Sequence, residues 1–359
     1  MTATAPEWDQ TVFRGRVQTA LDGFLDEQAE RLAPLGDDAA RLLAEARAIV
    51  SGGKRFRAAF CYWGFHAVAG PSYVDEDALV RACASLELLH ASALVHDDYM
   101  DASDTRRGRP ATHRGFAAEH RRDGWRGDPE QYGASAAILL GDLLLSWSDE
   151  LLRRCGLPLD RVVEALDVFD RCRSEVITGQ FLDVSVQARG AADVEAAMTV
   201  LRYKSAKYSI ERPLHIGATL AGASEAQLRD LSAFGLPLGE AFQLRDDLLG
   251  VFGDPSATGK PAGDDLVEGK RTVLVALALD GAPAADAARL DAALGSPLTV
   301  GQVAELRRII DDSGAHQQVE QVIGELADRA TTALGRADLD AAARVVLQQL
   351  ATAATVRVV

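Results

Sequence analysis

Residues 85–101 read SLELLHASALVHDDYMD, a run whose first part is almost uncharged and whose end is a cluster of acidic side chains. Its apolar residues recur at the three- and four-residue spacing of a buried helix face. On such a helix Asp97 and Asp101 are one turn apart and share a face, about 6 Å from each other. Asp98 lies about 100° round the axis. The run predicts a helix that presents two stacked carboxylates near its C-terminal end.

Two carboxylates at one spot repel each other unless a cation lies between them. Ligand sets made only of oxygen atoms indicate a hard ion, Mg²⁺ or Mn²⁺. The alternative is a solvated acidic helix end, although carboxylates at a helix C-terminus oppose the helix dipole and gain no stabilisation there. This segment alone favours metal binding and leaves the alternative open.

Helical periodicity recurs along most of the chain, and no convincing strand alternation is present. The predicted helices span residues 11–33, 37–51, 55–69, 75–102, 133–154, 158–186, 193–222, 225–251, 271–280, 298–312 and 317–336. Gly, Pro and Asp mark loops at 103–132, 253–270 and 281–297. Since composition does not shift along the 359 residues, we expect one all-α domain over 1–359. Long loops are often functional, and 253–270 is predicted to be a lid.

The net charge of −15 and the pI near 4.9 argue against nucleic acid and anionic membranes as partners. An anionic substrate would therefore need local clusters of Lys and Arg. The sequence has no run of 18 apolar residues, so no membrane span is expected. Residues 1–10 show no signal-peptide pattern. The four cysteines lack metal-site spacing and predict buried thiols in a reducing cytoplasm: Cys61, Cys83, Cys155 and Cys172.

A second acidic pair, Asp246 and Asp247, ends another apolar run, QLRDDLLG, with Gln243 one turn upstream on the same face. An isolated pair of aspartates is usually an exposed helix face. The first motif lies about 150 residues earlier in the chain. Together the two motifs indicate two helices that present carboxylates across a cavity.

Basic residues follow or precede both acidic motifs. They lie in GGKRFR (52–57), RRGR (106–109), KSAK (204–207), GKP (259–261) and GKR (269–271). Each cluster alone is usually a solvated surface. Jointly, in an acidic protein, they are typical of a metal–diphosphate site, where Mg²⁺ bridges carboxylate to phosphate and Lys and Arg neutralise the remaining charge.

The segments GGKRFR, HDDYMDASDTRRGRP, GQFLDV, KSAKYSIERP, FQLRDDLLGVFGDP and TGKPAGDDLVEGKRT occur in this order over residues 40–280. This set resembles the trans-isoprenyl diphosphate synthases, also called polyprenyl synthetases, most closely the bacterial geranylgeranyl diphosphate synthases. The resemblance implies a helical bundle around a central cavity. It also implies head-to-tail condensation of isopentenyl diphosphate with an allylic diphosphate (dimethylallyl, geranyl or farnesyl), three Mg²⁺ ions and a homodimer.

The resemblance also assigns roles to individual residues. Metal ligation falls to Asp97, Asp98, Asp101, Asp246 and Asp247, with Asp97, Asp101 and Asp246 as the main ligands. The isopentenyl diphosphate would be bound by Lys54, Arg57, His90 and Arg107. The allylic diphosphate would be bound by Arg106, Lys204, Gln243, Lys260 and Lys270. Lys204, Ser205 and Gln243 would act at the ionising centre.

Two features refine this expectation. The second acidic motif of the family usually carries a third Asp, where this chain has Gly250. A class I terpene cyclase shares the fold, but its second metal motif usually begins with Asn, and this chain contains no asparagine.

Product length should depend on residues that precede Asp97 on its helix. In the family an aromatic side chain four or five residues upstream stops growth early, and here those positions are Ala93 and Ser92, with Leu89 deeper. We therefore expect a C20 product, geranylgeranyl diphosphate, with C25 or longer as the alternative.

Overall fold

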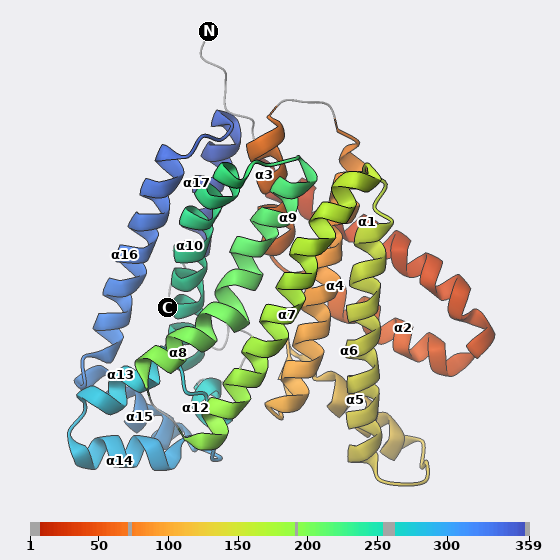
Figure 1. Ribbon diagram of the computed structural model, residues 1–359. Coiled ribbons are helices and arrows are strands. Elements are labelled where there is room, and N and C mark those ends of the chain that lie inside the picture. The colour runs from red at the N-terminus through yellow and green to blue at the C-terminus, as the bar shows by residue number, and fades with distance from the viewer. Residues whose placement is uncertain (1–7, 71–73, 191–192, 254–262, 356–359) are drawn as a thin grey trace. The chain divides into compact units, whose positions relative to one another are not determined.

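The computed structural model describes residues 8–70, 74–190, 193–253 and 263–355. Helices dominate these residues, and the two strands are two residues long (Figure 1). The all-α prediction is confirmed. The residues form two compact units, one of 1–168, 213–224 and 339–346, the other of 169–212, 225–338 and 347–359. The prediction of a single domain over 1–359 stays a prediction.

Unit 1 begins with four helices and a 3₁₀ turn. They are α1 (Gln10–Leu32), η1 (Ala33–Leu35), α2 (Asp37–Val50), α3 (Phe56–Ala69) and α4 (Glu76–Met100). A hairpin of β1 (Thr105–Arg106) and β2 (Arg109–Pro110) follows, then α5 (Thr112–Arg122) and α6 (Pro129–Arg153). Parts of α7 (Leu159–Arg189), α9 (Arg212–Leu220) and α17 (Ala341–Thr355) complete the unit.

Unit 2 contains the rest of these three helices and a second set of elements. They are α8 (Val194–Val200), a π-helical segment η2 (Leu201–Glu211), α10 (Glu225–Phe252), α12 (Asp264–Glu268), α13 (Val273–Gly281), α14 (Ala284–Ala293), α15 (Val300–Asp312) and α16 (Ala315–Arg336). Its core is formed mainly by Leu, Ile, Val and Ala side chains of α10, α13, α15 and α16.

Helix α4 is the central element of unit 1. Asp75 caps its first turn by accepting from the N–H groups of Asp77 and Ala78. The helix is long and apolar enough to cross a membrane, the one such helix among the described residues, but 78% of its most apolar window is buried inside the protein. It packs along α6 (Figure 1), and a side chain at Gly141 of α6 would overlap the His96 ring. These contacts fix the position of α4 along its own axis relative to α6, and therefore the position of its acidic C-terminal end.

In unit 2, α10 packs on η2 and on α16. A Cβ at Gly239 would come within 2.5 Å of the Ala206 carbonyl oxygen, so the two backbones approach closely. Among the described residues of this unit, η2 is the segment with π-helical geometry, and such segments are frequent at functional sites.

The predicted loops contain helices that the sequence pattern did not reveal. Helix α5 lies inside 103–132, α12 inside 253–270 and α14 inside 281–297, and α17 follows the last predicted helix. The buried face of α5 includes His113 and His120 beside Phe116 and Ala117, so its apolar pattern is incomplete. Helix α14 is rich in Ala and buries only Leu290 among its residues, which leaves almost no periodicity to detect.

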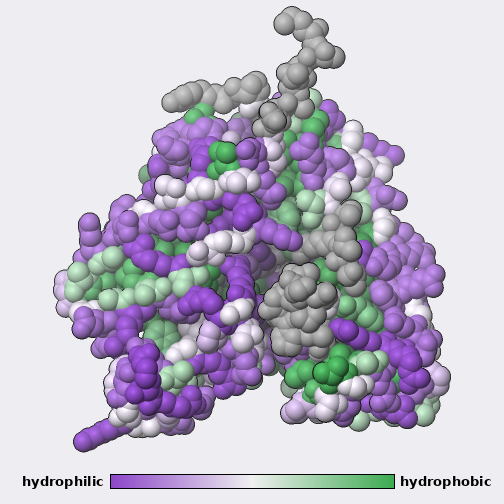
Figure 2. Space-filling model, turned by 180° about the vertical axis from the view of Figure 1, so that it is seen from behind, coloured by the Kyte–Doolittle hydropathy of each residue, from purple (hydrophilic) through white to green (hydrophobic). Residues whose placement is uncertain are grey.

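Most of the surface on the face shown in Figure 2 is hydrophilic, with smaller hydrophobic patches between. This agrees with the acidic composition of the chain.

Candidate active site

The first acidic motif forms the last turn of α4, as the sequence predicts. The N–H of Asp101 donates to the Asp97 carbonyl oxygen at 2.8 Å, so both residues continue the helical geometry. Asp97 and Asp101 are half-buried, whereas Asp98 is buried. The two stacked acids of the prediction therefore share one helix face.

Asp98 is held by an arginine of the hairpin that follows. Arg106 donates through Nε to the two carboxylate oxygens of Asp98 at 2.8 and 3.1 Å, and its terminal nitrogen also donates to Asp98. The turn needs left-handed backbone at Ala102 and Arg107. The ion pair therefore fixes the direction of the Arg106 side chain and occupies both carboxylate oxygens of Asp98.

Three of the residues predicted to bind isopentenyl diphosphate, Arg57, His90 and Arg107, come together in unit 1. Burial lowers the pKa of His90 well below its usual value, and nearby Arg57, Arg107 and Arg106 lower it further. Arg107 donates to the carbonyl oxygens of Ile49 and Ser51 at 3.4 and 3.2 Å, beside the GGKRFR segment. His90 therefore lies among guanidinium groups that disfavour its protonation, and this cluster of cations is suited to an anionic ligand.

Lys54 of the same segment is exposed and Arg57 is half-buried. A Cβ at Gly53 would approach the Arg107 guanidinium to 3.3 Å. The backbone of Gly53 has φ 89°, which favours glycine. The loop can therefore pass close beside Arg107.

In unit 2, Lys204 lies on the π-helical segment and donates to Asp183 of α7 at 2.6 Å. A Cβ at Gly179 would overlap the Lys204 backbone, at 2.5 Å from its nitrogen. Ser205 follows and is half-buried. Gly179 and Asp183 belong to the GQFLD segment, whose resemblance to short-chain synthases also favours the C20 product, but sequence reasoning gave Asp183 itself no role. The contact with Lys204 identifies Asp183 as a further candidate site residue.

The second acidic motif lies near the end of α10. Gln243 donates to Asp247 at 2.8 Å. Burial raises the pKa of Asp247 to about 7, with the Gln243 hydrogen bond acting in the opposite direction and Asp265 and Asp246 adding to the rise. Asp246 is half-buried. As in the first motif, one aspartate is held inside and its neighbour is more accessible.

Gly250 lies against a side chain of α12 in this structure. A Cβ there would lie 1.9 Å from Oδ2 of Asp265, a residue of α12. Lys270 pairs with the same Asp265 at 3.4 Å and with Glu268 at 2.5 Å. A carboxylate from α12 thus occupies the space beside position 250, which sequence reasoning did not foresee. Lys260 lies outside the described residues, as does half of the proposed lid, residues 254–262 of 253–270.

The predicted chain-length residues lie on α4 below the acids. Leu89 and Ser92 are buried and Ala93 is half-buried. The continuous helix from Glu76 to Met100 keeps the register on which their assignment depends.

The donor chemistry fits Mg²⁺. Among the described residues, no group of three or more His, Cys, Asp and Glu side chains is placed to hold a metal ion. Magnesium usually keeps several waters and binds one or two carboxylates together with phosphate oxygens of a substrate. Asp97 and Asp101 therefore suit one part of its ligand shell, and their ligation stays a prediction.

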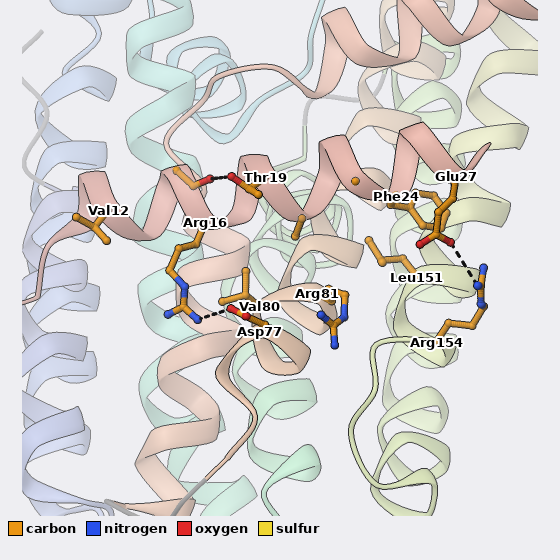
Figure 3. A pocket seen from close by; sticks show the side chains of 13 residues that line it. Val12, Arg16, Thr19, Phe24, Glu27, Asp77, Val80, Arg81, Leu151 and Arg154 are labelled. Atoms are coloured by element: carbon orange, nitrogen blue, oxygen red, sulfur yellow. Dashed lines mark hydrogen bonds and ion pairs between the residues drawn. The ribbon is translucent and has the colours of Figure 1, made fainter. Parts of the chain in front are cut away.

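Unit 1 also contains a pocket of about 640 Å³ on the side of α1, shown in Figure 3. Arg16 pairs with Asp77 at 3.2 Å and Glu27 with Arg154 at 3.3 Å along its walls. The lining includes none of the predicted site residues. The ion pairs link α1 to the start of α4 and the end of α6.

Three comparisons place this geometry in a family. The polyprenyl synthetase family matches residues 40–311. A short chain isoprenyl diphosphate synthase of Methanothermobacter thermautotrophicus is 34% identical over 78% of this chain and 79% of its own. A geranylfarnesyl diphosphate synthase of Aeropyrum pernix is 31% identical over 82% and 86%. Other relatives are named geranylgeranyl or farnesyl diphosphate synthase.

Among solved structures, a geranylgeranyl pyrophosphate synthase from Corynebacterium glutamicum, complexed with isoprenyl diphosphate and magnesium, has a TM-score of 0.95 at 41% identity. The match covers 98% of this chain and all of that one. The helical fold, the order of the motifs and the family match agree, and the chain belongs to the polyprenyl synthetase family of prenyltransferases.

Proposed function

We propose that this protein is a Mg²⁺-dependent head-to-tail prenyltransferase that condenses isopentenyl diphosphate with an allylic diphosphate and makes geranylgeranyl diphosphate (C20). The observation that carries the proposal is the hairpin in unit 1: its Arg106 pairs with Asp98 at the acidic end of α4, and the adjacent Arg107 lies near His90. Carboxylates that can hold Mg²⁺ and cations that can bind a diphosphate are what this reaction requires.

The product length rests on α4. Neither Ser92 nor Ala93 is large enough to close a tunnel there, and the buried Leu89 lies about 12 Å below Asp97 along the helix at 1.5 Å per residue. Relatives with names for C15, C20 and C25 products leave C25 or longer as the alternative. A terpene cyclase is disfavoured, because it would have no use for an isopentenyl diphosphate site.

The proposed metal ligands are Asp97, Asp101 and Asp246 for three Mg²⁺ ions, with Asp98 and Asp247 in support. When bound, Mg²⁺ would stabilise the charge that develops on the departing diphosphate. Mn²⁺ is a chemically similar substitute.

The chain's own residues divide the remaining work. Lys54, Arg57, His90 and Arg107 bind the isopentenyl diphosphate. Arg106, Lys204, Gln243, Lys260 and Lys270 bind the allylic diphosphate and stabilise it as the C–O bond ionises. Ser205 and Gln243 direct oxygen dipoles at the allylic cation without being strong nucleophiles. Because none of the described residues is assigned as a dedicated base, the released diphosphate is the proposed acceptor of the proton lost from C2.

We further propose that the protein acts as a cytoplasmic homodimer in which residues 1–359 work as one domain. Exposed apolar side chains on α6 support dimerisation, since Ile138 and Leu139 are 44% and 60% exposed. Light scattering of the pure protein would show twice the mass of the 38.3 kDa chain. A monomer would contradict the dimer without affecting the assigned reaction.

The reaction is tested by incubating the pure protein with isopentenyl diphosphate, Mg²⁺ and C5, C10 or C15 primers, followed by mass spectrometry of the products. The expected result is a C20 diphosphate from each primer, with loss of activity in EDTA. Failure to consume isopentenyl diphosphate with any primer would refute the proposal.

The tunnel is tested by Ser92→Phe, which should shorten the product to C15 because a ring would fill the space about one and a half turns below Asp97. Thr332→Phe, on the exposed side of α16, is the control, because that helix carries neither the proposed tunnel nor the proposed dimer surface. A C15 product from the wild type, or an unchanged product from Ser92→Phe, would contradict the tunnel assignment.

A further inference from the structure

Arg55 differs from its neighbours in GGKRFR because its side chain points inward. Its side chain is 4% exposed, whereas Lys54 is exposed and Arg57 is half-buried. The Arg55 backbone has φ 56°, a left-handed conformation that is uncommon for a residue with a side chain. It lies at the N-cap of α3, which begins at Phe56. Some contact must hold this unfavourable turn.

The guanidinium of Arg55 is used by contacts inside unit 1. Its NH1 donates to Glu87 at 3.0 Å, and its NH2 donates to Gln18 at 2.7 Å and to the Val50 carbonyl oxygen. A guanidinium with these partners acts as a structural bracket. It is poorly placed to bind a substrate phosphate at the same time.

Glu87 connects this bracket to the helix that carries the metal motif. It lies on α4, three residues before His90, and its side chain is 5% exposed. Its Oε2 accepts from Arg55, and its Oε1 accepts from the N–H of Ala58 at 3.3 Å. One buried carboxylate therefore holds both the Arg55 side chain and the first turn of α3.

The surrounding charges are mostly positive. Burial and Arg55 lower the pKa of Arg107, and Glu87 acts in the opposite direction. Glu87 is therefore the counter-charge of a cluster that must stay assembled before an anionic ligand arrives. Buried charges of one sign need such compensation.

We propose that Glu87 is a positioning residue for isopentenyl diphosphate. It holds Arg55 in its left-handed turn and thereby sets the directions of Lys54 and Arg57, which flank that turn. The inference rests on the proposed function for its ligand, and it adds two residues, Arg55 and Glu87, that the sequence motifs left without a role.

The first test is Glu87→Gln, which keeps an acceptor for the Ala58 N–H and removes the charge that holds Arg55. The KM for isopentenyl diphosphate should rise roughly tenfold or more, because small misplacements of binding groups have large effects. The KM for the allylic primer and kcat should change much less. The matched control is Glu320→Gln, which breaks the Arg245–Glu320 pair of unit 2 and should lower stability without this selectivity.

Unchanged KM for isopentenyl diphosphate in Glu87→Gln would overturn the proposal. So would a parallel loss of all kinetic parameters that matches the loss in Glu320→Gln, since that would indicate a structural role alone. If Glu87→Gln folds poorly, Arg55→Gln/Glu87→Gln removes both buried charges and should fold better. This double variant should retain the raised KM, because the turn has lost its bracket.

A second measurement does not depend on activity. Amide hydrogen exchange of residues 51–58 in the substrate-free protein should be faster in Glu87→Gln than in the wild type, with no such change in Glu320→Gln. Unaltered exchange would contradict the positioning role. If the wild type does not consume isopentenyl diphosphate, the proposed function fails, and the exchange experiment still decides whether Glu87 holds the turn.

Discussion

The two acidic motifs use the same arrangement with different partners. In unit 1 the buried acid is Asp98, which pairs with the guanidinium of Arg106. In unit 2 the buried acid is Asp247, which accepts from the neutral amide of Gln243 and has its pKa raised by burial to about 7. In each motif the adjacent pair of aspartates divides into one internally held side chain and one more accessible side chain.

This difference changes how such a motif should be interpreted. Two adjacent aspartates are on different sides of a helix, so they are not equivalent metal ligands. A charged partner keeps the first motif's buried acid as part of an ion pair, whereas an uncharged partner leaves the second motif's acid with less compensation. We therefore expect Asp98 and Asp247 to position their neighbours, and Asp97, Asp101 and Asp246 to carry the metals.

The largest effect should come from the accessible acids of the first motif. Asp97→Asn or Asp101→Asn should lower kcat/KM by about a thousandfold or more, because each removes charge where the developing diphosphate charge must be stabilised. Initial rates at saturating Mg²⁺ measure this. Asp77→Asn, at the exposed start of the same helix, is the control and should retain near-normal activity. Normal turnover in Asp101→Asn would remove the basis of the metal assignment.

A smaller but sharper contrast is expected within the second motif. Asp246→Asn should lower kcat/KM by about a hundredfold. Asp247→Asn should cost less than tenfold, because an amide oxygen can still accept from Gln243 in the same place. Rates measured across a range of Mg²⁺ concentrations should show weakened metal dependence only for Asp246→Asn. Equal losses would show that the division into held and accessible acids is wrong for this unit.

The ion pair of the first motif allows a coupling test. Asp98→Asn and Arg106→Gln should each lower kcat/KM for the allylic primer by about ten- to a hundredfold. The double variant should be no worse than the poorer single one, since each substitution removes the same interaction. A double-mutant cycle of kcat/KM measures the coupling. Strictly additive losses would mean that the two side chains act independently in the reaction.

The sequence predicted the helical fold and the motif-bearing helices because apolar periodicity and acidic helix ends are local signals. The register of Asp97 and Asp101 follows from α4 alone. The partners of Arg55 and Lys204 could not be predicted, because Glu87 and Asp183 lie 32 and 21 residues away in the chain. Helix α5 was missed because histidines occupy part of its buried face.

The reason for Gly250 was also hidden from the sequence. The sequence shows only that an expected carboxylate is missing, whereas the fold places Asp265 of α12 against that position. Steric conflicts between segments distant in the chain have no local signature. Gly250 therefore reads as a missing carboxylate in the sequence and as a contact with the Asp265 side chain in the structure.

The smallest expected effect tests the contact between position 250 and Asp265 directly. In an exposed helix, Gly→Ala normally stabilises a protein by about 0.5–1 kcal/mol. Gly324 of α16 has no atom within 4 Å of a Cβ, so Gly324→Ala should show this gain. Gly250→Ala should show less of this gain, because the new methyl group would overlap the Asp265 carboxylate, and that side chain must rotate and loosen its contact with Lys270. Urea unfolding followed by circular dichroism measures both variants.

Gly250→Asp, which restores the family's third acid, should be less stable still and leave kcat/KM no higher than in the wild type, since two carboxylates would compete for one space. A gain for Gly250→Ala equal to that of Gly324→Ala, or a more active Gly250→Asp, would show that Asp265 does not fill the space beside position 250.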